Sequence, residues 1–466
     1  MNNKVIVVYD DTRKPSREIA SITGKNSFGD TIFKRKTLKE HVFSMFENFE
    51  NVGKVIDTAS KDILGLFGDN QVLLLYSDFG IINVKEAETL CYKACFAHEN
   101  YKITCRGKIC AVIFKDTDSF KDAKVSDFDT YTDIPTDGFV DLSDGTNFKT
   151  FITSGFEARF FNSLSGDEYT LVKSSENADK LYNEYCFYGL LPDDMKQWFV
   201  RPFDFKRDGD KGSYKMQRYH MTDLAIRYVH GAIKEDEFED ILSKLFYFVN
   251  HRLAQKVSRE EYEAIAEKLY IQKVSERLES LKKMPGYDKL ATLIKSGTDY
   301  EDVDGIFEKY KSLYTRIRRN TEFEYKKVVG HGDMCFSNIL YSYETDLLLF
   351  IDPKGAEKAE DMYMDPFYDL AKLSHSVCGH YDYFNSDLYE INFDENLKAK
   401  VFVDADNRKY VEIFKGFLEE NGFDFKLVRL YEASLFLSML PLHMDRPKKV
   451  FGFVLNAIAI LDSLED

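Results

Sequence analysis

Residues 327–356 read KVVGHGDMCFSNILYSYETDLLLFIDPKGA, and this stretch decides the fold. It starts with a short apolar run and a loop that contains Asp333 and, five residues later, Asn338. A second apolar run, a polar turn and a third apolar run follow, and the third run leads into Asp352. The pattern predicts a strand, a loop and then a β-hairpin that ends in a carboxylate.

Asp333, Asn338 and Asp352 are the kinds of side chain that phosphoryl transfer requires. In this chemistry the protein mainly positions the reactants and neutralises charge. We expect Asp333 to be the catalytic residue that orients the attacking hydroxyl, and Asn338 and Asp352 to be oxygen ligands of Mg²⁺. A polar surface turn would also explain the loop, but it would not explain a second carboxylate at the end of the next hairpin.

Upstream, residues 146–230 are predicted to form antiparallel strands followed by a helix. The strand-like pieces are FKTFITSG, ARFFNSLSG and EYTLVKSS, and Ala178–Leu190 has helical spacing. Lys173 lies in the third strand-like piece and Glu184 lies in the helix. A lysine on a strand can neutralise the phosphates of ATP if a glutamate holds its ammonium in place. This order therefore predicts that Lys173 and Glu184 bind the nucleotide.

Two further segments are candidates for nucleotide binding. The backbone N–H groups around Ser154 and Gly155 in SGFEARFF are expected to cover the phosphates. Met216 and Tyr219 would bound a hinge whose backbone reads the adenine edge, or else they belong to an ordinary edge strand.

The stretches HGDMCFSNIL, FIDPKGA and MDPFYDLAKL resemble the aminoglycoside phosphotransferase and choline kinase family, a branch of the protein-kinase-like fold. The resemblance runs from about residue 150 to the C-terminus. It implies an ATP- and magnesium-dependent kinase that phosphorylates a hydroxyl of a sugar, amino sugar or amino alcohol. It also implies that His331 ties the catalytic loop to the metal-binding loop, and that Asp365 and Asp369 fix loop and helix starts. Within the family, the chain looks most like phosphotransferases found with capsule or other surface-polysaccharide genes.

Residues 1–145 have a different pattern. Short apolar runs such as KVIVVYDD and QVLLLYSDFGII alternate with helical periodicity, which predicts an α/β domain with a largely parallel sheet. Asp10, Asp11 and Asp78 follow two of these strands, where ligands gather in such sheets, or they simply terminate the strands. GDTIFKRKTLKEHV and VLLLYSD faintly resemble a nucleotidyltransferase, although the glycine- and arginine-rich loop of that family is missing.

The length and composition of the chain limit the number and kind of domains that it can form. A chain of 466 residues with 44% hydrophobic residues predicts more than one folded domain. We therefore expect an α/β domain over residues 1–145, and an α+β bilobal protein-kinase-like domain with its N-terminal lobe at 146–230. Its helix-rich C-terminal lobe is expected at 231–466.

The net charge of −16 argues against nucleic-acid binding, because such binding requires clustered Lys and Arg. Seven cysteines and no apolar run of membrane-spanning length predict a reduced, cytoplasmic protein without membrane insertion. The expected partner is a small hydroxyl acceptor, and the sequence leaves the oligomeric state open. Candidate acceptor residues, or alternatively helix-packing residues, are His375, His380, Asp382, Tyr383, His443, Asp445 and Arg446.

Two other functions stay open at the level of sequence. The chain could be bifunctional, with a nucleotidyltransferase that acts on the kinase product. It could also be a pseudokinase that binds nucleotide as a scaffold, although such a scaffold would not need Asp333, Asn338 and Asp352 together.

Overall fold

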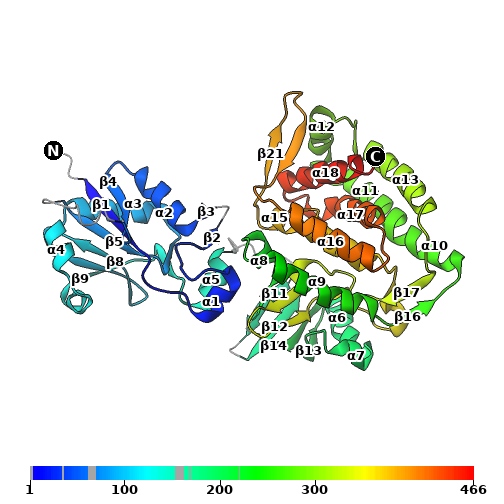
Figure 1. The fold of residues 1–466 in the computed structure, drawn as a ribbon, viewed down its shortest axis with the longest axis horizontal. Helices are drawn as coiled ribbons and strands as arrows, with labels where there is room; N and C mark the ends of the chain where they lie inside the picture. Colours follow the sequence, from blue (N-terminus) through cyan, green and yellow to red (C-terminus); the bar gives the residue numbers. More distant parts are fainter. Residues whose placement is uncertain are drawn as a thin grey trace. The chain divides into compact units, whose positions relative to one another are not determined.

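The computed structural model describes residues 4–33, 36–60, 70–152, 162–166, 169–219 and 221–465. The chain folds into two compact units (Figure 1). The first consists of Met1–Glu157 with His230–Ala232, and the second of Ala158–Val229 with Ile233–Asp466. Within the described residues, no helix is both long and apolar enough to cross a membrane.

The first unit is built on a six-stranded sheet with the strand order β4-β1-β5-β8-β7-β9. Its strands are β1 Val5–Asp10, β4 Val52–Asp57, β5 Val72–Tyr76, β7 Tyr101–Cys105, β8 Lys108–Phe114 and β9 Thr132–Pro135. β1 runs parallel to β4 and β5, as predicted, but β8 runs antiparallel to both β5 and β7. The expectation of a largely parallel sheet is therefore only partly correct. Arg106 and Gly107, both with positive φ, form a two-residue turn between β7 and β8, and so short a turn can join only antiparallel strands.

Helices and short strands complete this unit. They are α1 Arg17–Thr23, α2 Leu38–Glu47, α3 Val84–Cys95, α4 Thr117–Asp122, α5 Gly145–Ile152, β2 Ile32–Phe33, β3 Lys36–Thr37, β6 Phe79–Ile81 and β10 Phe139–Asp141. The prediction of a strand in FKTFITSG was wrong, because its first part lies in α5. Asp144 accepts the amide of Asn147, and Phe148 and Ile152, four residues apart, are both buried. That spacing is helical.

The second unit begins with a four-stranded antiparallel sheet in the order β11-β12-β14-β13. The strands are β11 Asn162–Gly166, β12 Thr170–Ser175, β13 Pro202–Asp208 and β14 Lys211–Gln217. Helix α6, Ala178–Leu190, has the predicted bounds, and α7, Asp193–Lys196, follows it. Asn177 begins α6 by accepting the amide of Lys180 with its side chain. The sequence did not predict β13.

The rest of the unit is mainly helical. Its helices are α8 Leu224–Val229, α9 Glu235–Asn250, α10 Arg259–Glu267, α11 Lys273–Lys282, α12 Tyr287–Gly297, α13 Val303–Arg319, α14 Tyr368–Val377, α15 Tyr381–Asn385, α16 Arg408–Glu420, α17 Phe425–Met439 and α18 Pro447–Asp462. Its strands are β15 Thr222–Asp223, β16 Ala254–Lys256, β17 Lys326–Val329, β18 Ile339–Ser342, β19 Leu347–Phe350, β20 Tyr363–Met364, β21 Glu390–Phe393 and β22 Ala399–Phe402.

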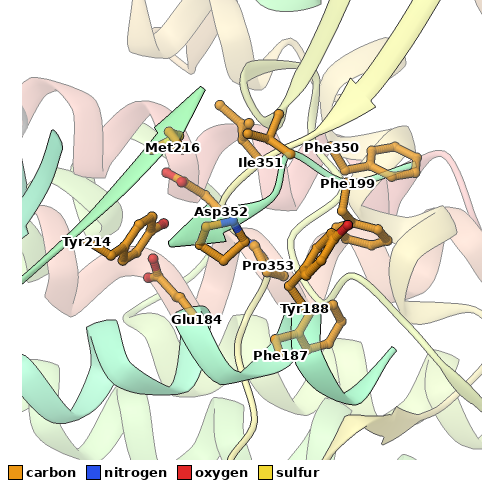
Figure 2. Close-up of a pocket in the computed structure, with 12 residues that line it drawn as sticks. Glu184, Phe187, Tyr188, Phe199, Tyr214, Met216, Phe350, Ile351, Asp352 and Pro353 are labelled. Atoms are coloured by element: carbon orange, nitrogen blue, oxygen red, sulfur yellow. The ribbon is translucent and has the colours of Figure 1, made fainter. Parts of the chain in front are cut away.

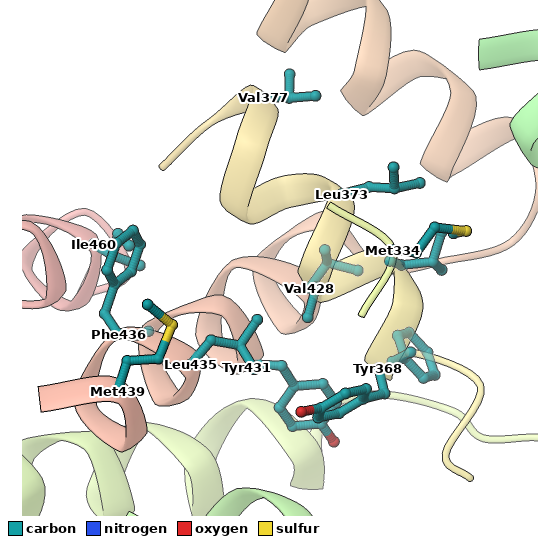
Figure 3. Packing of buried hydrophobic residues seen from close by; sticks show 14 of the residues in the cluster. Met334, Tyr368, Leu373, Val377, Val428, Tyr431, Leu435, Phe436, Met439 and Ile460 are labelled. Atoms are coloured by element: carbon teal, nitrogen blue, oxygen red, sulfur yellow. The ribbon is translucent and has the colours of Figure 1, made fainter. Parts of the chain in front are cut away.

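One large apolar core holds these helices together. Helix α17 is buried on nearly every side and packs against α14 and α18. Figure 3 shows Val428, Tyr431 and Leu435 of α17 in this core with Leu373 of α14. The ring of Tyr431 stacks on that of Tyr270, with centroids 3.6 Å apart. This packing fixes α14, and α14 in turn contacts the loop that contains Asp333.

Candidate active site

The loop between β17 and β18 is held in place by Asp369 of α14. The Asp369 carboxylate accepts the backbone amides of His331 (3.0 Å) and Gly332 (2.8 Å). Gly332 has a φ of 78°, and a Cβ there would lie 2.6 Å from the Cβ of Lys354. A side chain at position 332 is therefore excluded both by the backbone conformation and by the neighbouring loop.

Asp369 is itself neutralised by a buried arginine. The Arg252 guanidinium donates to Asp369 at 3.0 Å and to the carbonyl of Pro366 at 3.0 Å. Both side chains are buried. Burial lowers the pKa of Arg252, and the Asp369 carboxylate opposes that shift. The pair fixes the start of α14 relative to the loop that contains Asp333.

His331 connects the two loops of the site. Its Nδ1 accepts the backbone amide of Asp333 at 3.1 Å, so Nε2 carries the proton and donates to the carbonyl of Ile351 at 2.9 Å. The ring also stacks on Phe199. Burial lowers the pKa of His331, which keeps the imidazole neutral. With both nitrogens engaged, the ring positions the loops and is not available as a base.

Asp333 has a fixed carboxylate with an accessible face. Asn338 Nδ2 donates to the Asp333 carbonyl (2.8 Å) and to Oδ2 (3.0 Å), and Lys372 Nζ lies 2.9 Å from Oδ1. The Asp333 side chain is still 43% exposed. Because the amide nitrogen of Asn338 faces Asp333, its Oδ1 points away from that carboxylate. The amide of Ile351 donates to the carbonyl of Asn338 at 3.0 Å, which joins this loop to the one that contains Asp352.

Lys173 meets two carboxylates. Its Nζ lies 2.5 Å from Glu184 Oε2 and 2.8 Å from Asp352 Oδ1, and the Lys173 side chain is only 3% exposed. Burial alone would lower the pKa of Lys173, but the two carboxylates reverse the shift and raise it, so the amine stays charged. Burial raises the pKa of Glu184, and Lys173 opposes this shift. Lys173 and Glu184, predicted to bind nucleotide, thus lie in one network with Asp352, a predicted metal ligand.

The loop after β19 is shaped by two residues with positive φ. Asp352, two residues beyond the end of the strand, has a φ of 57°, and Gly355 has a φ of 87°. A Cβ at Gly355 would lie 2.7 Å from the backbone of Asn183 and Glu184. The amide of Ala356 donates to the carbonyl of Asn183 at 3.0 Å. Close contact with α6 therefore requires glycine here and sets the distance between Glu184 and Asp352.

An apolar pocket opens beside this network. Figure 2 shows Glu184, Tyr214 and Asp352 at one end and Phe199 and Phe350 at the other. Tyr214 and Met216 enter the pocket from β14, and Phe187 and Tyr188 enter from α6. The pocket therefore spans from the antiparallel sheet to the Asp352 loop.

Several sequence candidates lie elsewhere. Ser154 and Gly155 fall outside the described residues. Met216 is buried at the end of β14 and lines the pocket, whereas Tyr219 lies beyond the strand, half-buried, and does not line it. His375 is buried and stacks on Tyr381, so among the acceptor candidates it takes part in packing.

The described carboxylates at the strand ends of the first unit contact other residues of that unit. Asp78 pairs with Arg13 at 3.1 Å, and Asp11 accepts the amide of Gly29 at 3.0 Å. In the described part of the chain, no group of three or more His, Cys, Asp or Glu residues is arranged to hold a metal ion. Cys91 and Cys110 are buried thiols whose pKa burial raises to about 12.

Sequence reasoning missed two basic residues of the site. Lys372 lies inside the MDPFYDLAKL stretch, one helical turn after Asp369, so its spacing was a usable signal. Arg252 lies 117 residues before its partner Asp369, and no local pattern marks it.

The comparisons with known proteins return solved structures alone. No family model matches the chain, and no curated protein does. Aminoglycoside phosphotransferase APH(4)-Ia is 11% identical, covers 69% of this chain and 99% of its own, and has a TM-score of 0.39. A thermostable mutant of that protein, in complex with AMP-PNP and hygromycin B, covers 67% and 97% with 11% identity and a TM-score of 0.37. ADP-bound APH(2'')-Ib is 13% identical and covers 69% and 97%, with a TM-score of 0.33. These are structures of the family that the three motifs resemble.

Proposed function

We propose that this chain is an ATP- and magnesium-dependent kinase that phosphorylates a hydroxyl group of a small polar metabolite. The observation that carries the proposal is one connected network within the second unit. Lys173 is bonded to both Glu184 and Asp352. The Asp352 loop is bonded to the Asp333 loop through Ile351, both by its amide and by its carbonyl. Phosphoryl transfer requires a cation that binds the phosphates, oxygen ligands for magnesium and an accessible carboxylate that orients the hydroxyl. The network contains all three kinds of group.

Magnesium fits the oxygen atoms on these two adjoining loops. Asp352 offers a carboxylate and Asn338 an amide oxygen, and Mg²⁺ prefers a few protein oxygen ligands with water and phosphate completing its shell. Bound there, the ion would neutralise charge on the transferred phosphoryl group. Asn338 is oriented for this role by its two hydrogen bonds to Asp333.

The residues of the chain then divide the work. Lys173, held by Glu184, binds the α- and β-phosphates of ATP. Asp333 accepts a hydrogen bond from the acceptor hydroxyl and directs its oxygen at the γ-phosphorus. A new oxygen–phosphorus bond forms while the bond from the γ-phosphorus to the bridging oxygen breaks, and ADP leaves. The hydroxyl proton passes to Asp333 and from there to solvent.

We further propose a bilobal architecture for the second unit and a class of acceptor. The four-stranded sheet with α6 would serve as the N-terminal lobe of a bilobal kinase, and residues 231–466 as its C-terminal lobe. Met216 would lie next to the adenine site. The resemblance to enzymes found with surface-polysaccharide genes supports a sugar or sugar derivative as acceptor.

A pair of aspartates on one hairpin allows a matched test. Asp352 and Asp346 both have a φ near +55°, a conformation that asparagine also accepts. Asp352→Asn removes a proposed magnesium ligand, so turnover should require a higher magnesium concentration. Asp333-dependent ATP turnover should also fall at least about 100-fold. Asp346→Asn should leave turnover unchanged. Turnover is measured as ADP release across a magnesium titration. Equal turnover in the two variants would contradict the proposal.

A further inference from the structure

The carboxylate proposed to orient the acceptor hydroxyl lies beside a lysine from another element. Lys372 of α14 places Nζ 2.9 Å from Asp333 Oδ1, and its own side chain is only 12% exposed. Burial alone would lower the pKa of Lys372, but Asp333, together with Tyr368, Cys335 and Tyr381, more than offsets this effect and raises it, so Lys372 stays positively charged. An acceptor that reaches Asp333 must therefore also meet an ammonium group.

A second lysine lies on the same side of α14. Tyr368 precedes Lys372 by one helical turn, so both side chains lie on one face of the helix. The Tyr368 hydroxyl is 2.8 Å from Nζ of Lys273, which begins α11. Burial alone would raise the pKa of Tyr368, yet Lys273 and Lys372 together lower it, which agrees with two cations beside one phenol. Lys273 is half-buried and reaches the surface.

The charged groups on the elements packed against α14 contact or act on other residues. Arg429 of α17 donates a hydrogen bond to Glu432 of the same helix. His375, one turn after Lys372, is kept neutral because burial, with Lys372, holds its pKa well below the ordinary value. Asp382 is buried and acts electrostatically on Cys335 and Tyr228. Lys372 is paired with Asp333, whereas Lys273 donates to the hydroxyl of Tyr368.

From this arrangement we infer that the acceptor carries an anionic group, a carboxylate or a phosphate, next to the hydroxyl that is phosphorylated. Lys372 and Lys273 would bind that group, with Tyr368 between them. A cationic amino alcohol or amino sugar would instead bring a third positive charge to the same place, which disfavours binding. The inference rests on the proposed kinase function and narrows its acceptor class.

A matched hexose series tests the inference on the full-length chain. Glucose, glucosamine, glucuronate and glucose 6-phosphate share one ring and differ in charge, and the two acids separate a carboxylate from a phosphate. For each compound, the concentration that half-maximally stimulates or inhibits Asp333-dependent ATP turnover is measured. At least one acid should act at a concentration at least about tenfold lower than glucosamine. Lys273→Gln should remove most of that advantage, whereas Lys268→Gln, on an exposed position before α11, should keep it.

The results distinguish failure of the kinase proposal from failure of the anionic-acceptor inference. If ATP turnover does not depend on Asp333 at all, the kinase proposal itself fails. If turnover depends on Asp333 but glucosamine acts at an equal or lower concentration than both acids, only the anionic acceptor is refuted. The absence of any preference among the four compounds also overturns it, as does an acid preference that survives Lys273→Gln.

Discussion

Lys173 carries one positive charge between the carboxylates of Glu184 and Asp352, in a place that water barely reaches. Loss of either carboxylate would leave the charge of this buried amine less compensated. When ATP binds, its phosphates can replace part of this contact, so the position of Lys173 should matter for nucleotide affinity.

Removal of the positive charge of Lys173 should impair the use of ATP. Lys173→Met should raise the KM for ATP and lower kcat, with a combined loss of at least about 100-fold in kcat/KM, because the phosphates lose their fixed cation. Lys211→Met removes an exposed lysine that pairs with Glu176, and it should change neither constant. Initial-rate kinetics over a range of ATP concentrations measures both. If the two variants behave alike, Lys173 does not bind the nucleotide.

Single residues differ in how far the sequence predicts them. Asp333, Asn338 and Asp352 could be predicted together because the loop and hairpin that hold them are local in sequence. Lys173 and Glu184 could be paired from their order alone. Arg252 could not be predicted, since its contact with Asp369 depends on how the segment after α9 meets the start of α14, and such contacts are a long-range property.

At the scale of elements, the contact between α14 and α17 contains a buried carboxyl group. Glu432 of α17 accepts hydrogen bonds from Ser374 of α14 and from Arg429. Burial raises the pKa of Glu432 to about 7, and its two partners oppose the shift. The folded state therefore keeps a proton that the unfolded state has lost between about pH 4.5 and pH 7.

This shift makes stability depend on pH in a defined direction. Because the folded pKa lies above the unfolded one, the contribution of Glu432 falls as pH rises through that window, by on the order of 3 kcal/mol in total. Glu432→Gln should lack this fall, so its thermal midpoint between pH 5 and pH 8 should decline less than that of the wild type. Thermal unfolding of both proteins across this range measures the difference. Parallel pH profiles would show that Glu432 does not titrate there.

Elements were predicted best where periodicity was long and unambiguous. Ala178–Leu190 was predicted with its observed bounds, whereas FKTFITSG is too short to separate helical from strand spacing and was assigned wrongly. The antiparallel entry of β8 into the first sheet also escaped prediction, because strand direction there depends on the Arg106–Gly107 turn.

At the scale of the whole molecule, the residues proposed for phosphoryl transfer all belong to the second unit. Asp78, in the first unit, pairs with Arg13 of the same unit. Asp78→Asn should therefore leave phosphoryl transfer within about twofold of the wild type, because the groups proposed to bind ATP belong to the other unit. A loss of tenfold or more would show that the first unit takes part. Pyrophosphate release that persists in Asp333→Asn but disappears in Asp78→Asn would favour the bifunctional alternative.

Kinase activity is tested most directly by transfer of the γ-phosphoryl group from labelled ATP in the presence of magnesium. The full-length wild-type chain is compared with the Asp333→Asn variant. Asparagine keeps the size of the side chain but cannot accept the hydroxyl proton. The wild type should give labelled product or labelled phosphate, and the variant should do so at a rate at least about 1,000-fold lower. Both proteins should bind ATP with similar affinity. Equal rates in the two proteins, or no turnover in either with ATP bound, would contradict the account.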